Sequence, residues 1–225
     1  HSVKHLQEGG VLALKSIGGY HMVADPFQRE AVEKLRLWKQ REEKPFALMF
    51  SSVDEIREYC YVSREEEDLL RCGARPILLL RRKENAPKPI SHRVYGTSPY
   101  LGCFLPSFGA QVLLCEAMGP VIMTSANGKD QPIRKDEAEI RDFMEGKGPI
   151  LYNRRRIRIP LDDSVVRVVD NKPQMIRRSK GYVPLPIHMP TSLPKEEMIL
   201  AMGGDLKAAF CLTKGPFATI SPFFG

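Results

Sequence analysis

The chain has 225 residues, with 43% hydrophobic and 27% charged side chains, values typical of a globular domain or of one domain joined to part of another. It has no apolar run near the roughly 18 residues of a membrane span and no apolar signal-peptide core at its start, so we expect no membrane association and either a cytoplasmic protein or a trimmed chain. The net charge of +7 favours an anionic partner such as a nucleotide, phosphate or nucleic acid.

The cysteine pattern argues against a zinc site and against a disulfide framework. The number of cysteines is odd, their spacings are wide, and no pair forms Cys-x-x-Cys. We expect reduced, mostly buried thiols in a reducing compartment. The cysteines are Cys60, Cys72, Cys103, Cys115 and Cys211.

The chain begins with a predicted buried strand, a glycine pair and a helix. Residues 11–15 form a short apolar run that is typical of a buried strand, and Gly18 and Gly19 follow it. Two glycines after a strand let the backbone approach a ligand closely, but they also form ordinary turns, and both interpretations stay open. Asp25 as the N-cap and Pro26 at the first helical position then predict a helix start.

The stretch from Trp38 to Phe50 connects this helix to a second buried strand through a cluster of cations. Lys39, Arg41 and Lys44 lie between the apolar helix face and the apolar run at residues 46–50. Because the helix and the strand would hold both ends of the cluster, the three cations could converge on an anion. The alternative is a solvated basic loop, whose charge the two neighbouring glutamates reduce.

The middle of the chain alternates predicted strands and helices. Ser52-x-x-Glu55 and Ser63-x-x-Glu66 are capping boxes, and each predicts the start of a short helix. Continuous apolar runs predict strands, and apolar residues at helical spacing predict helices. The strands are expected at residues 77–80, 102–105 and 121–123, and the helices at residues 110–118 and 136–144.

The strand at residues 121–123 leads into a loop of small polar residues. Thr124, Ser125 and Asn127 carry hydroxyl and amide groups that can bind phosphate oxygens or a carbonyl group. The same loop contains Asn-Gly, which is a strong turn signal, so a plain turn is an equal alternative.

The remainder of the chain is predicted to be rich in β-structure. A strand at residues 150–152 precedes a hairpin, and prolines make residues 183–197 a stiff linker between domains. We therefore expect an α/β domain over residues 1–182, with a twisted mixed sheet and flanking helices, and a β-rich piece of a truncated second domain at residues 198–225. The individual strands are expected at residues 165–169, 174–178, 198–202, 207–213 and 217–220.

Ligands of open α/β sheets bind at strand ends, and four groups of hydrogen-bond donors lie at predicted strand ends. No His/Asp pair suits nucleophilic catalysis, and no spacing suits a metal site. Hydrogen-bond donors at several strand ends, without a nucleophile or a metal site, suit the positioning and charge stabilisation of a polyphosphate. The groups are Lys15 with Gly18 and Gly19; Lys39 with Arg41 and Lys44; Thr124 with Ser125 and Asn127; and Ser164 with Arg177.

Two other charged segments have alternative interpretations. Asp162 and Asp163 could help to hold Mg²⁺, but adjacent acids before a strand are more often caps or ion-pair partners. Residues 154–158 form the densest basic run, which supports a nucleic-acid-binding module on electrostatic grounds alone. No platform of interleaved aromatic residues accompanies it in the sequence.

Five segments resemble, in chain order, the motifs of the YrdC/Sua5 family, and most of all the version within HypF carbamoyltransferases of [NiFe]-hydrogenase maturation. They read G-G-V-L-A-L-K-S-I-G-G-Y-H, K-x-R-x-x-K-P-F-A-L-M, P-V-I-M-T-S-A-N, D-D-S-V-V-R-V-V and I-R-R-S-K-G-Y-V-P. The resemblance covers roughly residues 5–187. Residues 200–207 resemble the opening of the Kae1-like domain that follows in HypF.

The resemblance implies a chemistry. HypF-type proteins use ATP and carbamoyl phosphate to make a carbamoyl-adenylate, and they pass the carbamoyl group to the C-terminal cysteine of HypE. The YrdC-like domain joins carbamate to AMP and releases pyrophosphate, with Mg²⁺ accompanying the ATP. By this resemblance Lys39 and Arg41 are the catalytic residues, which hold the triphosphate, and Lys15 contacts the carbamate or the α-phosphate. The other implied binding residues are Gly18, Gly19, Lys44, Thr124, Ser125, Asn127, Ser164 and Arg177.

The sequence also departs from the family pattern. HypF chains usually have a histidine soon after the L-P that ends the middle strand, whereas here Gln111 lies in that region without a histidine. An acylphosphatase domain, a zinc-finger segment and most of the Kae1-like domain lie outside these residues, so we do not expect this piece to complete the full reaction.

The first alternative function is synthesis of threonylcarbamoyl-AMP for tRNA modification, and the second is binding of double-stranded RNA or another nucleic acid.

Overall fold

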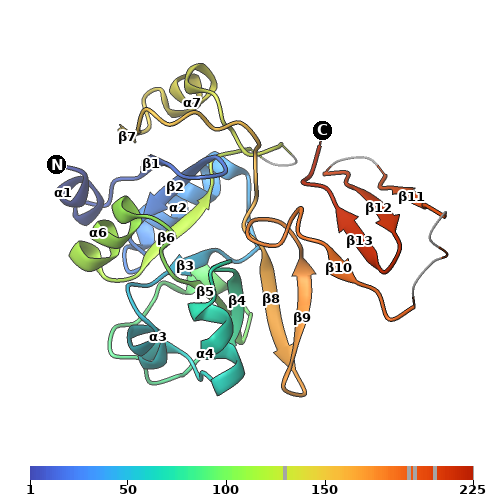
Figure 1. Ribbon diagram of the computed structural model, residues 1–225. Helices are drawn as coiled ribbons and strands as arrows, with labels where there is room; N and C mark the ends of the chain where they lie inside the picture. The colour runs from blue at the N-terminus through green and yellow to red at the C-terminus, as the bar shows by residue number, and fades with distance from the viewer. Residues whose placement is uncertain (129–130, 192–193, 195–196, 205–206, 225) are drawn as a thin grey trace.

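The computed structural model describes residues 1–128, 131–191, 194, 197–204 and 207–224, and it contains two β-sheets (Figure 1). The larger sheet has nine strands in the order β7-β1-β2-β6-β3-β5-β4-β8-β9. Its strands are β1 (Leu12–Lys15), β2 (Tyr20–Ala24), β3 (Ala47–Met49), β4 (Ile77–Arg81), β5 (Tyr100–Phe104), β6 (Val121–Ser125), β7 (Ile150–Leu151), β8 (Val165–Val169) and β9 (Lys172–Arg177).

The pairing within this sheet is mixed, as the alternation of predicted elements indicates. Strand β6 pairs antiparallel with both β2 and β3, whereas β3 pairs parallel with β5 and β4 pairs parallel with β8. The hairpin β8–β9 closes one edge, where Asp170 and Asn171 adopt positive φ angles of 50° and 58° in the turn. The α/β fold class with a mixed sheet and flanking helices is therefore confirmed.

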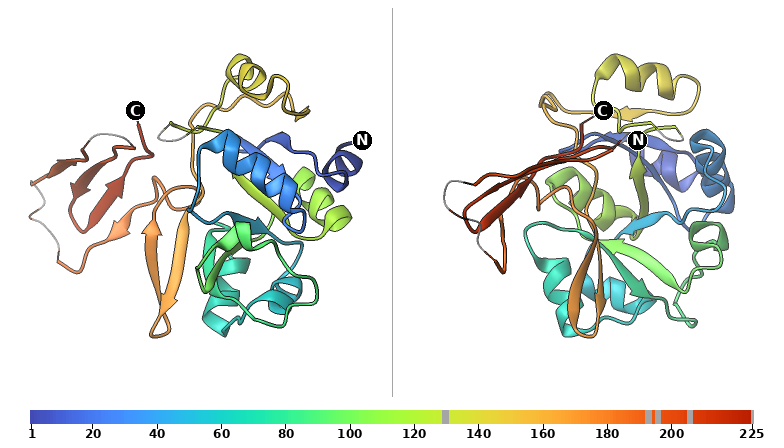
Figure 2. Two further views of the ribbon diagram at one scale, coloured as in Figure 1. Left: turned by 180° about the vertical axis from the view of Figure 1, so that it is seen from behind. Right: turned by 90° about the vertical axis from the view of Figure 1, so that its right-hand side faces the viewer.

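Helices cover both faces of the larger sheet (Figure 2). Leu6 of α1 and Leu114 of α6 pack with β1 and β2 on one face, and Val32 and Leu35 of α2 pack on the other face. The helices are α1 (Ser2–Gln7), α2 (Arg29–Lys39), α3 (Val53–Tyr59), α4 (Arg64–Arg71), α5 (His92–Tyr95), α6 (Gly109–Met118) and α7 (Glu137–Met144). No helix in the described part of the chain is long and apolar enough to cross a bilayer.

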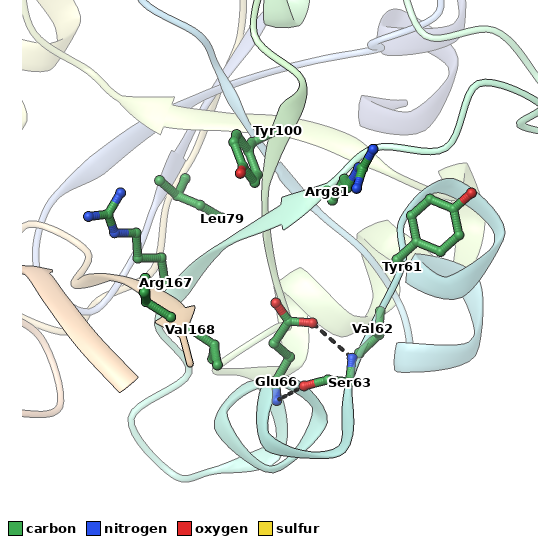
Figure 3. A pocket seen from close by; sticks show the side chains of 10 residues that line it. Tyr61, Val62, Ser63, Glu66, Leu79, Arg81, Tyr100, Arg167 and Val168 are labelled. Atoms are coloured by element: carbon green, nitrogen blue, oxygen red, sulfur yellow. Dashed lines mark hydrogen bonds between the residues drawn. The ribbon is translucent and has the colours of Figure 1, made fainter. Parts of the chain in front are cut away.

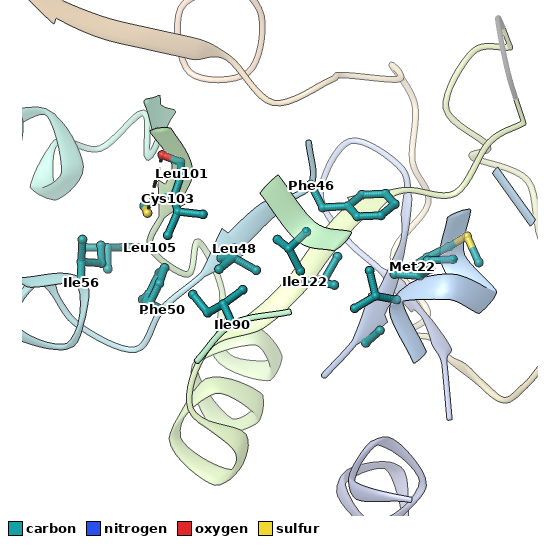
Figure 4. Close-up of a cluster of buried hydrophobic side chains, with 14 of the residues drawn as sticks. Met22, Phe46, Leu48, Phe50, Ile56, Ile90, Leu101, Cys103, Leu105 and Ile122 are labelled. Atoms are coloured by element: carbon teal, nitrogen blue, oxygen red, sulfur yellow. Dashed lines mark hydrogen bonds between the residues drawn. The ribbon is translucent and has the colours of Figure 1, made fainter. Parts of the chain in front are cut away.

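The apolar run predicted as a central strand lies in the middle of the core (Figure 4). Phe46, Leu48 and Phe50 are at most 1% exposed, and they pack against Ile56 of α3 and Ile122 of β6. Burial of this run stabilises the strand that anchors the end of the basic stretch. The stretch therefore has one fixed end at β3 and another at the end of α2.

The start of α2 differs from the prediction. The helix begins at Arg29 with Gln28 as its N-cap, three residues after the predicted Pro26. Asp25 Oδ1 accepts a hydrogen bond from the Phe27 amide at 2.8 Å, and the Gln28 side-chain amide donates to Asp25 Oδ2 at 3.3 Å. Asp25 therefore stabilises a turn that precedes the helix, as aspartate side chains commonly do.

The two predicted capping boxes form to different extents. Ser63 and Glu66 exchange both hydrogen bonds at the start of α4, which confirms the complete box. Ser52 accepts a bond from the Glu55 amide, but the Glu55 carboxylate binds Ser51 in place of the Ser52 amide. Both helices begin where the motif predicts them.

The C-terminal part of the chain forms the second sheet, which has four strands in the order β10-β13-β12-β11. It lies to one side of the larger sheet, beyond the β8–β9 hairpin (Figures 1 and 2). Strand β10 arises within the predicted linker and pairs with β13; residues 192–193 and 195–196 of that linker lie outside the described residues. The strands are β10 (Ile187–His188), β11 (Leu200–Met202), β12 (Phe210–Lys214) and β13 (Phe217–Ile220).

Candidate functional site

A large cleft of about 1180 Å³ lies at the C-terminal end of α2. Seven cationic and four acidic side chains line it, so the lining carries an excess of positive charge. Helices α2 and α5, the loop before β3, the end of β6, the segment before β8, the end of β9 and the segment before β12 all contribute. The lining residues are Glu33, Arg36, Leu37, Lys39, Gln40, Arg41, Glu42, Glu43, Lys44, Arg93, Ser125, Asn127, Gly128, Gln131, Asp162, Arg177 and Lys207.

Lys39 connects α2 to the loop that follows β6. Its side chain is buried, and its ammonium donates hydrogen bonds to the carbonyls of Ser125 and Asn127 and, at 2.8 Å, to Asn127 Oδ1. Burial, with smaller effects of Arg41 and Arg134, lowers the pKa of Lys39 to about 7. A lysine poised near neutrality can gain its proton when an anion binds beside it.

The loop after α2 is held by Arg36. Its guanidinium donates to the carbonyls of Arg41 at 2.6 Å and Glu42 at 2.7 Å, and Gln40 ends the helix with a left-handed φ of 49°. The guanidiniums of Arg36 and Arg41 lie 4.8 and 4.9 Å from the ring centroid of Phe46. The buried core therefore fixes the backbone of the basic loop.

Arg41 and Lys44 complete the predicted cation cluster. Arg41 Nε donates to the Lys44 carbonyl at 2.9 Å, and burial lowers the pKa of Arg41 to about 10, with further lowering by Arg36 and Arg177. Burial and Arg41 also lower the pKa of Lys44. Among the described residues no carboxylate forms an ion pair with Lys39, Arg41 or Lys44, so no negative side chain in direct contact offsets their charges.

Six of the eleven predicted site residues line the cleft. They come from three of the four predicted groups, so these segments lie around one cleft even though they are far apart in the sequence. The six are Lys39, Arg41, Lys44, Ser125, Asn127 and Arg177.

Lys15 does not line the cleft. It forms an ion pair with Glu137 of α7 at 3.0 Å and donates to the Asn153 carbonyl at 3.2 Å. Since its partner on β2 is Tyr20, its side chain shares the face of the sheet that α2 and α7 cover. The structure thus gives Lys15 two partners from distant parts of the chain, and the carbamate or α-phosphate contact that the resemblance implies stays a prediction.

The glycine pair and two hydroxyl residues also have structural partners outside the lining. A Cβ at Gly18 would lie 2.4 Å from the Leu161 carbonyl oxygen, and one at Gly19 would lie 2.4 Å from Ile133, so both glycines permit close packing of chain segments. Ser164 Oγ accepts from the Ser179 amide at 2.8 Å and donates to the Lys180 carbonyl at 2.9 Å. Thr124 is buried within β6.

A largely buried charge cluster lies next to Asp162, which lines the cleft. Asp163 accepts a hydrogen bond from Lys180 and contacts His21 Nε2 at 3.2 Å. Burial acts to raise the pKa of Asp163, but Lys180 and His21 outweigh it and hold the pKa well below its ordinary value. The neighbouring Asp162 lies on the cleft side, where its carboxylate binds Lys207 at 2.7 Å and lies 3.9 Å from Arg177.

A second, smaller cavity of about 460 Å³ lies between β4 and β8 (Figure 3). The two strands pair only at Ile77 with Val165 and at Leu78 with Val166, and the cavity lies beyond this pairing. Its carboxylate, on Glu66, is used in the capping box. None of the predicted site residues lines it.

Sequence reasoning missed several lining residues. Arg36 lies one helical turn before Lys39, so helical spacing could have indicated it. Arg93, Gln131 and Lys207 carry no such signal, because they reach the cleft from other segments. The basic run at residues 154–158 lines neither cavity, and its four arginines are exposed.

The donor set of the cleft suits a polyphosphate and does not itself form a metal site. Within the described residues no group of three or more His, Cys, Asp or Glu side chains could hold a metal ion. The carboxylate of Asp162 is engaged by cations. Ammonium, guanidinium and amide donors around one hollow can bind phosphate oxygens and offset the charge of a leaving pyrophosphate.

Comparisons with known proteins show the family to which the chain belongs. The Sua5/YciO/YrdC family model, described as telomere recombination, matches residues 4–179. Carbamoyltransferase HypF of Synechocystis sp. is 34% identical over 229 residues, covering 100% of this chain and 29% of its own length. The chain thus spans about 30% of the length of the curated relatives it matches.

Solved structures show the same similarity. A crystal structure of full-length HypF in a phosphate- and nucleotide-bound form matches with a TM-score of 0.90 and 38% identity, covering 100% of this chain and 35% of that chain. A Sua5 variant from P. abyssi shares the fold, with a TM-score of 0.70 at 19% identity over 82% of this chain and 53% of that chain. The chain is therefore similar to HypF along its whole length, and it belongs to the Sua5/YciO/YrdC family.

Proposed function

We propose that the cleft binds ATP and carbamate and forms a carbamoyl-adenylate. A carbamate oxygen attacks the α-phosphorus, the bond from the α-phosphorus to the oxygen bridging to the β-phosphate breaks, and pyrophosphate leaves with the bonding electron pair. The substrate supplies its own nucleophile, so the protein needs to position the reactants and stabilise charge. This is the carbamoyl-related step of hydrogenase maturation that the similarity to HypF carbamoyltransferases suggests.

One observation carries the proposal: cations from α2 and its following loop, which have no carboxylate partner among the described residues, meet the Ser125–Gly128 segment in a single large cleft. Lys39 already contacts that segment through the carbonyls of Ser125 and Asn127. A triphosphate lying across this junction would contact Lys39 and Arg41 together. The similar HypF structure in a nucleotide-bound form supports a nucleotide as the ligand.

We assign roles from these positions. Lys39 and Arg41 would neutralise charge on the α-phosphate and on the leaving pyrophosphate, and Lys44 and Arg177 would bind the outer phosphates. Ser125 and Asn127 would donate hydrogen bonds on the nucleotide side. Mg²⁺ would enter with the nucleotide, because this ion commonly keeps its waters and the phosphates as ligands and takes few from the protein.

The remaining partners follow from the same family relation. Carbamate would arise from carbamoyl phosphate, and the carbamoyl group would pass to the C-terminal cysteine of HypE. Both steps need segments beyond those that form the cleft. They are proposals for the longer protein whose relatives this chain matches over about 30% of their length.

Exchange of labelled pyrophosphate into ATP tests the function. We expect exchange when carbamate is supplied with ATP and Mg²⁺, because adenylate formation is reversible, and no exchange with threonine plus bicarbonate. Exchange that requires threonine would replace the proposal with synthesis of threonylcarbamoyl-AMP. Tight RNA binding at about 0.2 M salt without ATP binding would favour the nucleic-acid alternative.

A further inference from the structure

The cleft receives one cation from the segment that leads into β12 of the second sheet. Lys207 precedes β12 and is the one lining residue from beyond residue 177 in the described part of the chain. Residues 4–179, which the family model matches, do not include it. A residue from outside the family domain therefore faces the same hollow as Lys39 and Arg177.

Lys207 is held in the cleft by Asp162. Its ammonium donates to Asp162 Oδ2 at 2.7 Å, and the Asp162 side chain is only 8% exposed. The other oxygen of Asp162 lies 3.9 Å from Arg177 of β9, so this carboxylate places a cation of the larger sheet beside one from the segment before β12. An ammonium has three donors, and the side chain of Lys207 is 38% exposed, so it can bind Asp162 and a further oxygen at once.

Two additional features of Lys207 are consistent with a position among the cations of the cleft. Its field contributes to the lowered pKa values of both Lys39 and Lys44, which requires that it lie near both. Its backbone adopts a φ of 59°, a left-handed conformation that is uncommon for a lysine and that is found preferentially at ligand sites. Close to Lys207 in the chain, the Gly203 amide donates a hydrogen bond to the Ala209 carbonyl at 2.7 Å.

We propose that Lys207, in the segment before β12, binds the polyphosphate of a nucleotide in the cleft, and that Asp162 positions it for this contact. The proposal rests on the function proposed above for the identity of the ligand. It goes further because it makes the site composite: the phosphates would bridge the nine-stranded and four-stranded sheets. Nucleotide binding would then hold the two sheets together, since both supply cations to one ligand.

Titration calorimetry with ATP and with pyrophosphate, using the 225-residue chain, tests this contact. We expect Lys207→Met to raise the Kd of both ligands about tenfold, because one charge-assisted hydrogen bond is lost, and Lys207→Arg to restore most of the affinity. Lys214→Met is the matched control, since Lys214 is an exposed lysine on β12 that does not line the cleft. Equal affinities of Lys207→Met and the unsubstituted chain for both ligands would overturn the proposal.

Hydrogen exchange of the unsubstituted chain gives a test that does not depend on the folding of a variant. Pyrophosphate should slow amide exchange in β12, because its binding ties the segment before this strand to the larger sheet. Binding without any slowing in β12 would contradict the contact. If pyrophosphate binding depends on Lys207 but carbamate does not support the exchange of pyrophosphate into ATP, this inference stands and the proposed function is rejected. If neither ATP nor pyrophosphate binds, the inference and the proposed function are both rejected.

Discussion

The neighbouring carboxylates of Asp162 and Asp163 belong to two regions that differ in how far their charges are paired within the protein. Asp163 lies in a closed cluster with His21 and Lys180, where each charge has a partner within the protein. Asp162 lies at the edge of a cleft with seven cations, most of which have no carboxylate partner among the described residues. One peptide unit thus separates a neutralised cluster from a region with excess positive charge.

The difference predicts that the Asp163 cluster contributes mainly to stability and that the cleft contributes mainly to ligand binding. A buried ion that has all of its partners contributes to the folded state, and removing one partner leaves the others uncompensated. Cations without partners raise the free energy of the folded chain, and an anionic ligand can relieve this cost. We therefore expect substitutions in the cluster to lower stability, and substitutions in the cleft to lower nucleotide binding and catalysis.

The largest effect is expected for Asp163→Asn. The neutral amide leaves the ammonium of Lys180 buried without a counter-charge, so the free energy of unfolding should fall by about 3–5 kcal/mol. Urea denaturation measures this change. Asp170→Asn is the control, because Asp170 is an exposed turn residue, and its effect should stay within about 0.5 kcal/mol. A loss below about 1 kcal/mol for Asp163→Asn would remove the distinction between the two regions.

Lys39→Met should have the next largest effect, on catalysis. Loss of the ammonium at the junction of α2 and the Ser125 loop should reduce carbamate-dependent pyrophosphate exchange about 100-fold, and Arg41→Ala should act in the same direction. Circular dichroism would show that each variant keeps its fold. Lys172→Met, at an exposed lysine of β9, is the control. Undiminished exchange in both cleft variants would refute their assigned role.

The pH dependence of ATP binding should show the lowered pKa of Lys39. This pKa is about 7, so Lys39 loses its proton above that pH, and the Kd for ATP should rise by up to about tenfold per pH unit until near pH 9. Calorimetry at several pH values measures the slope. In Lys39→Met the Kd for ATP should lack the part of the pH dependence that comes from Lys39. If the Kd of this variant and that of the unsubstituted chain change with pH in the same way, the assignment to Lys39 is contradicted.

The stability of the ligand-free chain should change with pH in the opposite sense. Between about pH 7 and the ordinary lysine pKa of 10.5, the unfolded chain binds the Lys39 proton and the folded chain does not. The free energy of unfolding should therefore increase with pH over this window, relative to Lys39→Met. Chemical denaturation at pH 7 and pH 9 gives the two values, and a relative decrease would reverse the sign of the argument.

Ser164→Ala should have the smallest effect and should place Ser164 on the stability side of the comparison. The substitution leaves the buried Ser179 amide without its acceptor, so we expect a loss of about 1–3 kcal/mol in unfolding free energy. ATP affinity should stay unchanged, because the side chain does not line the cleft. If Ser164→Ala lost much of its ATP affinity and kept its full unfolding free energy, Ser164 would instead belong to the binding site.

The sequence predicts elements well where the signal is local. The apolar run of β3, the complete capping box at Ser63 and the apolar spacing of α6 all occur where expected. Strand β2 has no such signal, because all five of its residues are buried and its polar and apolar residues do not alternate. The start of α2 was misplaced because Asp25 serves equally well in a turn and in a cap.

Residue type and position at strand ends are enough to recognise the cations Lys39, Arg41 and Lys44, the polar loop after β6 and Arg177. The family motifs are recognised from the order of their residues in the sequence. Which of these groups share a hollow depends on strand order and on the face that each side chain occupies. Lys15 points to α7, Ser164 holds Ser179, and Asp162 and Asp163 lie on opposite sides of one segment. Such contacts join residues far apart in the chain, so local patterns cannot specify them, and only the packed sheet decides them.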